Sequence, residues 1–290
     1  MVRMIRRGLP RRLEPVPIRM LILGVGPIIG LDILWLVLGN SLPVSTEMHV
    51  GLDFLATLLL VGGAIWVAGG LTGETIPRVL RSTGVFNLRL APLCIGATAV
   101  ALVFPVYIWI LPLRGVPIAL PSWYPVLRAA WVLTVVCFRE ELIYRGVLFR
   151  LVRQGRSFYI AGTVTGIVVV FEHIDALLQY RQLHSRDIWA TSGLIAFWFV
   201  LSFAHCVLYE RGRCALWASV LLHLAIDFHL LFSIQLPQGT PHDPAYTSAM
   251  LAQKVLLPLL VMAVSWLVLP GTQKKGAEVH QPGGKGRKWS

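Results

Sequence analysis

Four charged side chains lie within seven residues of a segment whose flanks are apolar: Arg139, Glu140, Glu141 and Arg145. Two further apolar segments each carry polar groups, His173 in one and the i, i+4 pair His223 and Asp227 in the other. Ionisable side chains at membrane depth are costly, and by default they indicate a functional site. These three segments therefore hold the candidate chemistry of the chain.

A carboxylate beside an imidazole in a low-dielectric pocket can act as a general base toward water. A second histidine and a polar residue on a neighbouring helix can donate hydrogen bonds to a developing oxyanion. Together these groups suffice to hydrolyse an amide without a serine or cysteine nucleophile. One glutamate and two histidines can also bind zinc. The residues alone leave both alternatives open.

Helical geometry separates the roles of the two glutamates. Glu141 and Arg145 are four residues apart and share a helix face, in the favourable order for an ion pair. Glu140 lies about 100° round the helix from Glu141. We expect Arg145 to neutralise Glu141 and hold it in place, while Glu140 points toward the histidines.

The three polar segments are predicted to meet at one depth. The midpoint between Glu140 and His173 falls in the polar stretch 153–157. If the chain turns there, both residues lie roughly 24 Å along antiparallel helices, at about 1.5 Å of rise per residue. The next polar segment enters from the same side after Arg213, which places His223 and Asp227 roughly 15 and 21 Å deep.

The composition is that of a polytopic membrane protein with an all-α helical bundle. Of 290 residues, 56% are hydrophobic and 14% charged, whereas soluble domains carry about 25% charged residues. The net charge is +12, but the arginines cluster at the ends of apolar spans and form no continuous basic face. We interpret the basic residues as determinants of membrane topology and expect the bilayer, not nucleic acid, as the partner.

Runs of about 20 mostly apolar residues are needed for a helix to cross a bilayer. Eight segments meet this condition: 17–38, 50–70, 91–111, 123–149, 158–175, 190–209, 213–233 and 252–270. Segment 74–89 is predicted to be an interfacial amphipathic connector. We expect a single membrane-embedded domain over 17–270, a basic N-terminus over 1–16 and a disordered basic tail over 271–290.

Basic residues predict the orientation of these spans. With the N-terminus in the cytoplasm, 21 of the 26 lysines and arginines fall on the cytoplasmic half. Both termini are therefore predicted to be cytoplasmic, in a membrane that we expect to be a bacterial plasma membrane. The four cysteines show no C-x-x-C spacing and are interpreted as buried hydrophobic residues.

The polar segments resemble the CPBP family of intramembrane glutamic endopeptidases, which includes the type II CAAX prenyl proteases and the bacterial Abi proteins. Glu140, Glu141 and Arg145 match the family's first motif, E-E-x-x-x-R. The resemblance covers about residues 120–235, whereas the first 90 residues have only generic membrane character.

The second and third motifs, F-x-x-x-H and H-x-x-x-N, are matched with two departures. His173 meets the second, but Val169 stands where phenylalanine is usual. His223 and Asp227 meet the third with aspartate in place of asparagine. His205 lies only 18 residues before His223, too close for the second motif, and is interpreted as an inter-helix hydrogen-bonding residue.

The resemblance implies an eight-span bundle with a conical cavity open to the cytoplasm and no catalytic metal or cofactor. It implies that Glu140 and His173 activate water and that Glu141 and Arg145 support their helix. His223 and the residue at 227 would form the oxyanion hole. An ionised Asp227 would repel an oxyanion, so this residue must be protonated or must orient His223.

The resemblance further implies a peptide or protein substrate. It could be a lipid-anchored or prenylated-like peptide, a bacteriocin precursor or the C-terminal sorting tail of an exported protein. Three other classes stay open: a zinc-dependent membrane hydrolase using the same residues, a non-catalytic scaffold or immunity protein of the same fold, and a proton-coupled transporter. The transporter has least support, because no pair of broken helices appears in corresponding halves.

Overall fold

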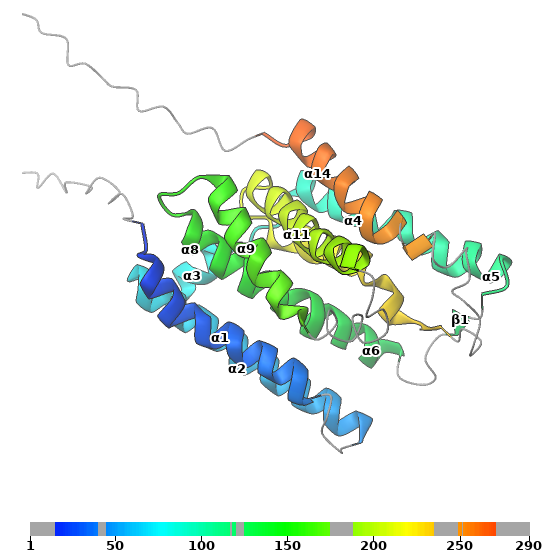
Figure 1. Cartoon of the computed structure of the whole chain (residues 1–290), viewed down its shortest axis with the longest axis horizontal. Helices are drawn as coiled ribbons and strands as arrows, with labels where there is room; N and C mark the ends of the chain where they lie inside the picture. Colours follow the sequence, from blue (N-terminus) through cyan, green and yellow to red (C-terminus); the bar gives the residue numbers. More distant parts are fainter. Residues whose placement is uncertain are drawn as a thin grey trace, which may run out of the picture.

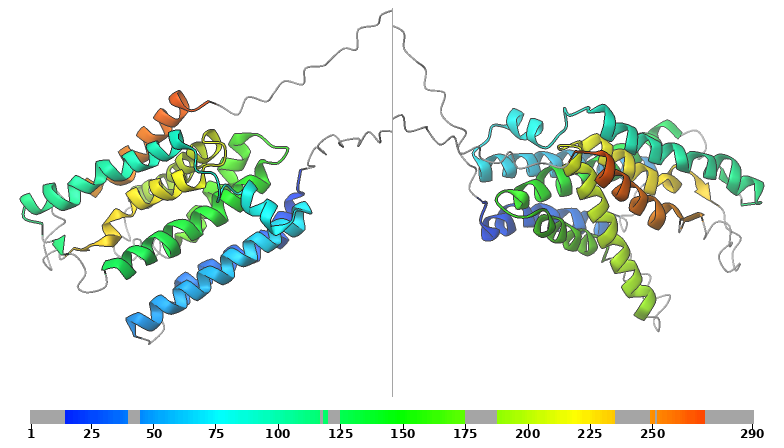
Figure 2. Two further views of the ribbon diagram at one scale, coloured as in Figure 1. Left: turned by 180° about the vertical axis from the view of Figure 1, so that it is seen from behind. Right: turned by 90° about the horizontal axis from the view of Figure 1, so that it is seen from above.

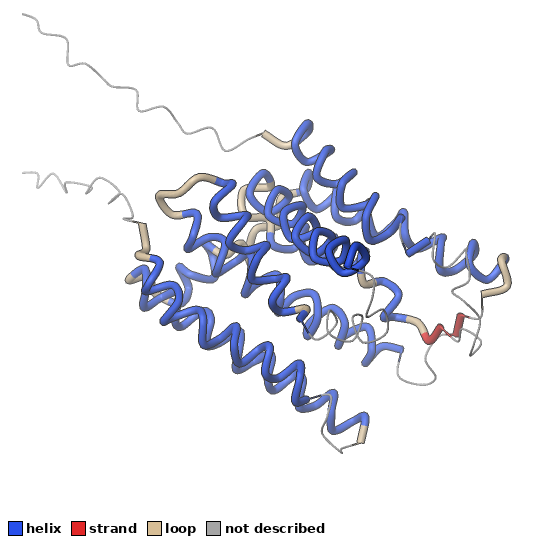
Figure 3. The backbone as a smooth tube through the Cα atoms, viewed as in Figure 1, coloured by secondary structure: helices blue, strands red, loops and turns tan. Residues whose placement is uncertain are grey.

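The computed structural model describes residues 15–39, 45–116, 118–119, 125–174, 188–234, 249–250 and 252–270. Over these ranges the chain is an all-α bundle of long helical segments, as predicted (Figures 1 and 3). The only strands described are β1 (Ile118–Ala119) and β2 (Ser233–Ile234), a two-residue antiparallel pair at one end of the bundle. The basic N-terminus over 1–14 and the tail over 271–290 lie outside the described residues.

The first two helices, α1 (Ile18–Gly39) and α2 (Thr46–Thr72), run side by side along one edge of the bundle (Figure 1). The Ser45 side chain caps α2 by accepting from the amide of Met48. Gly73 ends it in the left-handed conformation, with φ of 67°. A short helix, α3 (Ile76–Ser82), lies within the segment predicted to be a connector.

The opposite edge is formed by helices far apart in the sequence (Figures 1 and 2). One is the continuous helix α4 (Leu90–Pro105), η1 (Val106–Ile110) and α5 (Leu111–Leu113). The other comprises η5 (Ala252–Leu256) and α14 (Leu257–Val268). Gly96 lets α4 approach α12 closely, since a Cβ there would lie 2.7 Å from the carbonyl oxygen of Ala218.

The charged segment belongs to one continuous helix at the centre of the bundle. It comprises α6 (Pro125–Trp131), η2 (Val132–Phe138), α7 (Arg139–Glu141), η3 (Leu142–Phe149) and α8 (Arg150–Arg153). Both η2 and η3 have the wider hydrogen-bonding pattern of a π-helix, which is rare and often found at functional sites. Glu140 and Glu141 thus lie between two stretches of irregular helix.

Three further helices surround this segment: α9 (Phe158–Glu172), α11 (Ile188–Arg211) and α12 (Leu216–Ile226), the last followed by the 3₁₀ turn η4 (Phe228–Leu231). Gly162 and Gly166 allow α9 to pack against Phe203 and Phe199 of α11. Viewed from above, α11 runs obliquely and extends beyond its neighbours (Figure 2).

The surface and interior have the polarity expected of a protein in lipid. Large apolar side chains face outward, among them Leu58 and Trp66, which are 70% and 72% exposed. The buried set includes charged residues such as Arg139 and Glu141. The chain is therefore an integral membrane protein.

Four helices are long and apolar enough to cross a bilayer, with windows at Ile18–Trp35, Met48–Thr72, Leu90–Leu113 and Ser192–Arg211. Shorter apolar helices are found over Phe158–Glu172, Leu216–Ile226 and Ala252–Val268. Together with the charged central helix, these segments correspond to the eight predicted spans. Two predicted spans were too long, because α9 ends at Glu172 and α12 ends at Ile226.

Candidate active site

One cavity of about 400 Å³ brings together the six residues predicted to form the site. Its lining includes all six of them, Glu140, Glu141, Arg145, His173, His223 and Asp227. They come from the central helix, from the end of α9 and from the end of α12, as the matched distances from the intervening turns predict. The polar and aromatic part of the wall also includes Phe197, Trp198 and His205 of α11, His229 of η4 and Lys254 of η5.

Glu141 is fully buried and is the most heavily hydrogen-bonded of these residues. Its Oε1 lies 2.9 Å from Nδ1 of His223 and 3.1 Å from Nδ1 of His205. The Ser219 hydroxyl donates to Oε2 at 2.5 Å. Nη1 of Arg145 lies 3.2 Å from Oε1, so the predicted i, i+4 ion pair forms. The Glu141 carboxylate is thus held by donors from three helices.

The two glutamates differ in how closely they approach the histidines. We expected Glu140 to point toward the imidazoles, and it does face His223, but Glu141 makes the closer contacts. Glu140 lies between Nε2 of His223, at 3.7 Å, and Nη2 of Arg139, at 3.8 Å. Both distances are long for direct hydrogen bonds. The Glu140 carboxylate therefore borders the cavity without a close partner.

His223 lies between two carboxylates, one at each ring nitrogen. Nδ1 faces Glu141, and Nε2 lies 3.2 Å from Oδ2 of Asp227. A ring placed in this way can donate from both nitrogens, the arrangement that favours an imidazolium. Oδ1 of Asp227 lies 3.8 Å from Nζ of Lys254. Asp227 is therefore placed to orient His223.

His173 occupies the C-cap of α9, where the helix ends at the cavity wall. Its Nδ1 lies 2.9 Å from the carbonyl oxygen of Val169, so Nδ1 carries a proton and Nε2 is left as an acceptor. The ring packs on Trp198, with centroids 4.8 Å apart. The nearest oxygen of Glu172 is 3.9 Å from Nδ1, so the Val169 carbonyl is the group that orients this ring.

Sequence reasoning left His205 and Ser219 out of the site. The inter-helix hydrogen bond predicted for His205 is confirmed, since its Nδ1 lies 2.9 Å from the hydroxyl of Ser219 on α12. However, this bond lies within the site, not apart from it. The sequence did contain a sign that His205 belongs to the site. Residue 214, halfway between His205 and His223, falls in the turn between α11 and α12, so the two histidines lie at equal distances from that turn.

In the part of the chain that the structure describes, no group of three or more histidine, cysteine or acidic side chains is arranged to hold a metal ion. All four cysteines are free, and Cys137 and Cys206 are buried as predicted. Cys94, predicted to be buried, is exposed instead, and Cys214 is only partly buried.

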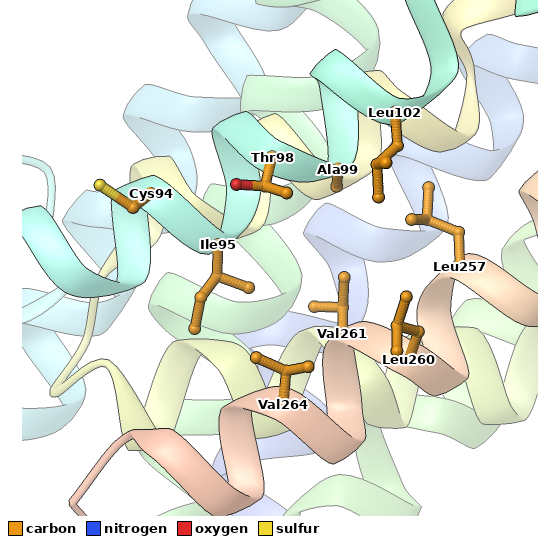
Figure 4. A pocket seen from close by; sticks show the side chains of 9 residues that line it. All are labelled: Cys94, Ile95, Thr98, Ala99, Leu102, Leu257, Leu260, Val261 and Val264. Atoms are coloured by element: carbon orange, nitrogen blue, oxygen red, sulfur yellow. The ribbon is translucent and has the colours of Figure 1, made fainter.

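A second pocket lies between α4 and α14 (Figure 4). Its side chains are almost all aliphatic, among them Leu102, Leu257 and Val261, and its only hydroxyl is that of Thr98. No acid, base or cation lines this pocket, so it carries no chemistry of its own.

Comparison with known proteins agrees with the geometry of the polar cavity. Residues 121–229 match the family model described as type II CAAX prenyl endopeptidase, Rce1-like. The matched range contains all six predicted site residues, and it supports assignment of the chain to the CAAX protease family. No curated protein and no solved structure matches the chain.

Proposed function

We propose that this CAAX protease-like chain is an intramembrane glutamic-type endopeptidase that hydrolyses a peptide bond with water activated by Glu140 and His173. One observation carries the proposal. The carboxylate of Glu140, the rings of His173 and His223, and Asp227 all line one largely buried cavity. This is the convergence that hydrolysis by activated water requires.

Glu140 is the proposed base because its carboxylate alone is available. Glu141 already accepts from Arg145, Ser219 and two histidines, so it has little capacity left for water. In the proposed reaction Glu140 takes a proton from water, and the resulting hydroxide attacks the peptide carbonyl carbon. The proton then passes to the leaving amine, which restores the Glu140 carboxylate.

His173 and His223 have different proposed roles. The lone pair at Nε2 of His173, left free by the Nδ1 bond to Val169, accepts a hydrogen bond from the attacking water. His223 stabilises the developing oxyanion through Nε2–H, which in this structure faces Asp227 and in the proposed reaction is shared between Asp227 and the oxyanion. Asp227 orients His223, and Glu141 with Arg145 fixes the opposite side of the ring. The proposed role of Asp227 is therefore orientation of His223, which the 3.2 Å approach of its Oδ2 to Nε2 supports.

The proposed substrate is a membrane-associated peptide, prenylated or otherwise lipid-anchored. The side chains of Phe197, Trp198 and Leu201 of α11 form an apolar part of the cavity lining, beside the polar residues of the site. Such a lining suits a substrate that carries a hydrophobic group near the scissile bond. The proposed setting is a bacterial plasma membrane with both termini in the cytoplasm, on the basis of the distribution of arginine and lysine.

The test is cleavage of a synthetic farnesylated peptide ending in a CAAX sequence by the full chain in proteoliposomes. We expect Glu140→Gln to abolish cleavage while the protein stays folded and membrane-inserted. Glu74→Gln makes the same chemical change outside the cavity, where Glu74 pairs with Arg150, and should retain cleavage. Undiminished cleavage by Glu140→Gln would discard Glu140 as the base.

A second measurement covers native substrates of unknown sequence. Protein C-termini from cells carrying the wild-type chain are compared with those from cells carrying Glu140→Gln. Termini that appear only with the wild-type chain identify substrates. Identical sets of termini, together with no cleavage of the farnesylated peptide, would refute the protease proposal.

A further inference from the structure

A second buried polar cluster adjoins Glu140 through Arg139. It consists of Asp32 on α1, Arg139 and Tyr144 on the central helix, and Glu172 at the end of α9. Each is at most 2% exposed. None belongs to the six residues of the proposed catalytic site, and Asp32 lies outside the range that matches the family model.

Arg139 links Glu140 to the first helix. Its Nε lies 3.5 Å from Oδ1 of Asp32, and its Nη2 lies 3.8 Å from Oε1 of Glu140. Among the described residues, no other lysine or arginine forms an ion pair with either carboxylate. Arg139 is therefore the one described lysine or arginine at ion-pair distance from Glu140, and His223 is the other basic side chain at that distance.

Burying this cluster lowers the stability of the fold. We take this as a sign that the cluster serves a function. Arg139 Nε, Tyr144 OH and both oxygens of Asp32 and of Glu172 are buried, and among the described residues none of them makes a hydrogen bond of good geometry. Their contacts are looser, such as the 3.5 Å ion pair of Arg139 with Asp32 and the approach of Tyr144 to Glu172. Buried polar atoms without partners are rare in proteins, because each loses the free energy of hydration. Apolar side chains of similar size would pack α1 against the central helix at lower cost.

We propose that Arg139, held by Asp32 of α1, is a positioning residue that orients Glu140 as the base. This inference rests on the proposed function of Glu140. It makes the first span part of the active site, although that span lies outside the matched range. Arg139 does not line the cavity, and its proposed action is through the Glu140 carboxylate.

The electrostatics predict opposite effects for two substitutions. In Arg139→Gln the neighbouring cation is lost, so Glu140 takes up a proton more readily, and the acidic limb of the kcat profile moves to higher pH. In Asp32→Asn the cation stays and a like charge is removed, so the same limb moves to lower pH. A change in packing alone would not move the limb in opposite directions.

Other ionisable groups also face Glu140 and are the same in both variants. His223 of α12 approaches the Glu140 carboxylate directly. Glu172 and Tyr144, both members of the second cluster, also interact with its charge. We expect a shift of about one pH unit for each variant, which corresponds to about a tenfold change in kcat on the acidic limb. KM should change little, because neither residue lines the cavity.

The experiment is infrared spectroscopy of the full chain in lipid nanodiscs across a pH series. The C=O stretch of protonated Glu140 is assigned as the band lost in Glu140→Gln. We expect this band to appear at higher pH in Arg139→Gln and at lower pH in Asp32→Asn than in the wild type. Arg139→Lys keeps the positive charge, so its band should shift less than that of Arg139→Gln. If Arg139→Gln does not fold, Arg139→Lys is measured in its place.

Arg150→Gln is the matched control, because it removes an arginine that pairs with Glu74 outside the cavity; it should leave the band unshifted. Shifts of the same sign in Arg139→Gln and Asp32→Asn, or no shift in either, would overturn the inference. The spectroscopic result does not depend on turnover. It therefore stands apart from the cleavage assay, in which activity of Glu140→Gln would overturn the proposed function.

Discussion

Ser219 of α12 donates its hydroxyl proton to Glu141 at 2.5 Å and lies 2.9 Å from Nδ1 of His205 on α11. Because a carboxylate can only accept, the hydroxyl proton points to Glu141, and Ser219 Oγ accepts from His205. The two residues thus tie α11, α12 and the central helix together at the depth of the cavity. They also hold the carboxylate that orients His223.

Ser219→Ala is predicted to lower kcat about ten- to hundredfold, because a small displacement of Glu141 misplaces His223. The loss of a hydrogen bond to a buried charged group should also cost about 1.5–3 kcal/mol of stability. Cleavage kinetics and thermal unfolding in detergent test both effects. Ser265→Ala is the matched control, since the Ser265 hydroxyl is buried without a hydrogen-bond partner among the described residues. Equal kinetics for the two variants would remove Ser219 from the site.

The main predicted effect of Glu141→Gln is a lower stability of the fold. The substitution leaves the guanidinium of Arg145 without its carboxylate, and an uncompensated buried charge costs about 3–5 kcal/mol. The yield of membrane-inserted protein and its unfolding temperature should fall. Glu210→Gln weakens the more exposed pair with Arg153 and should cost at most about 1 kcal/mol. A comparable loss in the two variants would contradict the central role of Glu141.

Asp227→Asn is predicted to retain cleavage within about tenfold of the wild type, because the amide oxygen can still accept from Nε2 of His223. Asp227→Leu has no acceptor, so its kcat/KM should fall by about a hundredfold or more. The ratio of the two kcat/KM values measures the orienting role. If Asp227→Leu were as active as Asp227→Asn, orientation of His223 by residue 227 would be refuted.

Chelators are predicted to leave cleavage unchanged. Both nitrogens of His223 face carboxylate oxygens, and Glu141 is occupied by four donors, so neither side chain has a lone pair free for a metal. The check is incubation with a strong chelator, with the metal content of the protein measured in parallel. Loss of cleavage that zinc restores would instead favour a zinc-dependent hydrolase.

The sequence was sufficient to predict the helical segments and the meeting of Glu140, His173 and His223. Equal distances from a polar turn place residues of antiparallel helices at equal depth, and this holds for any regular helix. The same rule, applied to residue 214, places His205 beside His223. The position of the turn between α11 and α12 therefore predicts a contact that the sequence motifs alone do not.

Other features could not be read from the pattern. The π-type turns of η2 and η3 change the angular positions of Glu140 and Glu141, whereas regular helical spacing was assumed. The pairing of Asp32 with Arg139 joins residues 107 positions apart on helices that are not consecutive, and no turn relates their depths. Contacts of this kind depend on how the helices are arranged around one another.

Helix α12 ends inside the bundle, and the amide of Gln253 donates to its last two carbonyls, those of Ala225 and Ile226, at 2.6 and 2.9 Å. Tyr107 of η1 in turn donates to the Gln253 side chain at 2.6 Å. Asp227 follows directly on this capped end. A fragment limited to residues 121–229, the range that matches the family model, would lack Tyr107 and Gln253 and leave those carbonyls without these donors. The smallest autonomous unit of this chain is therefore expected to include the helices that carry Tyr107 and Gln253.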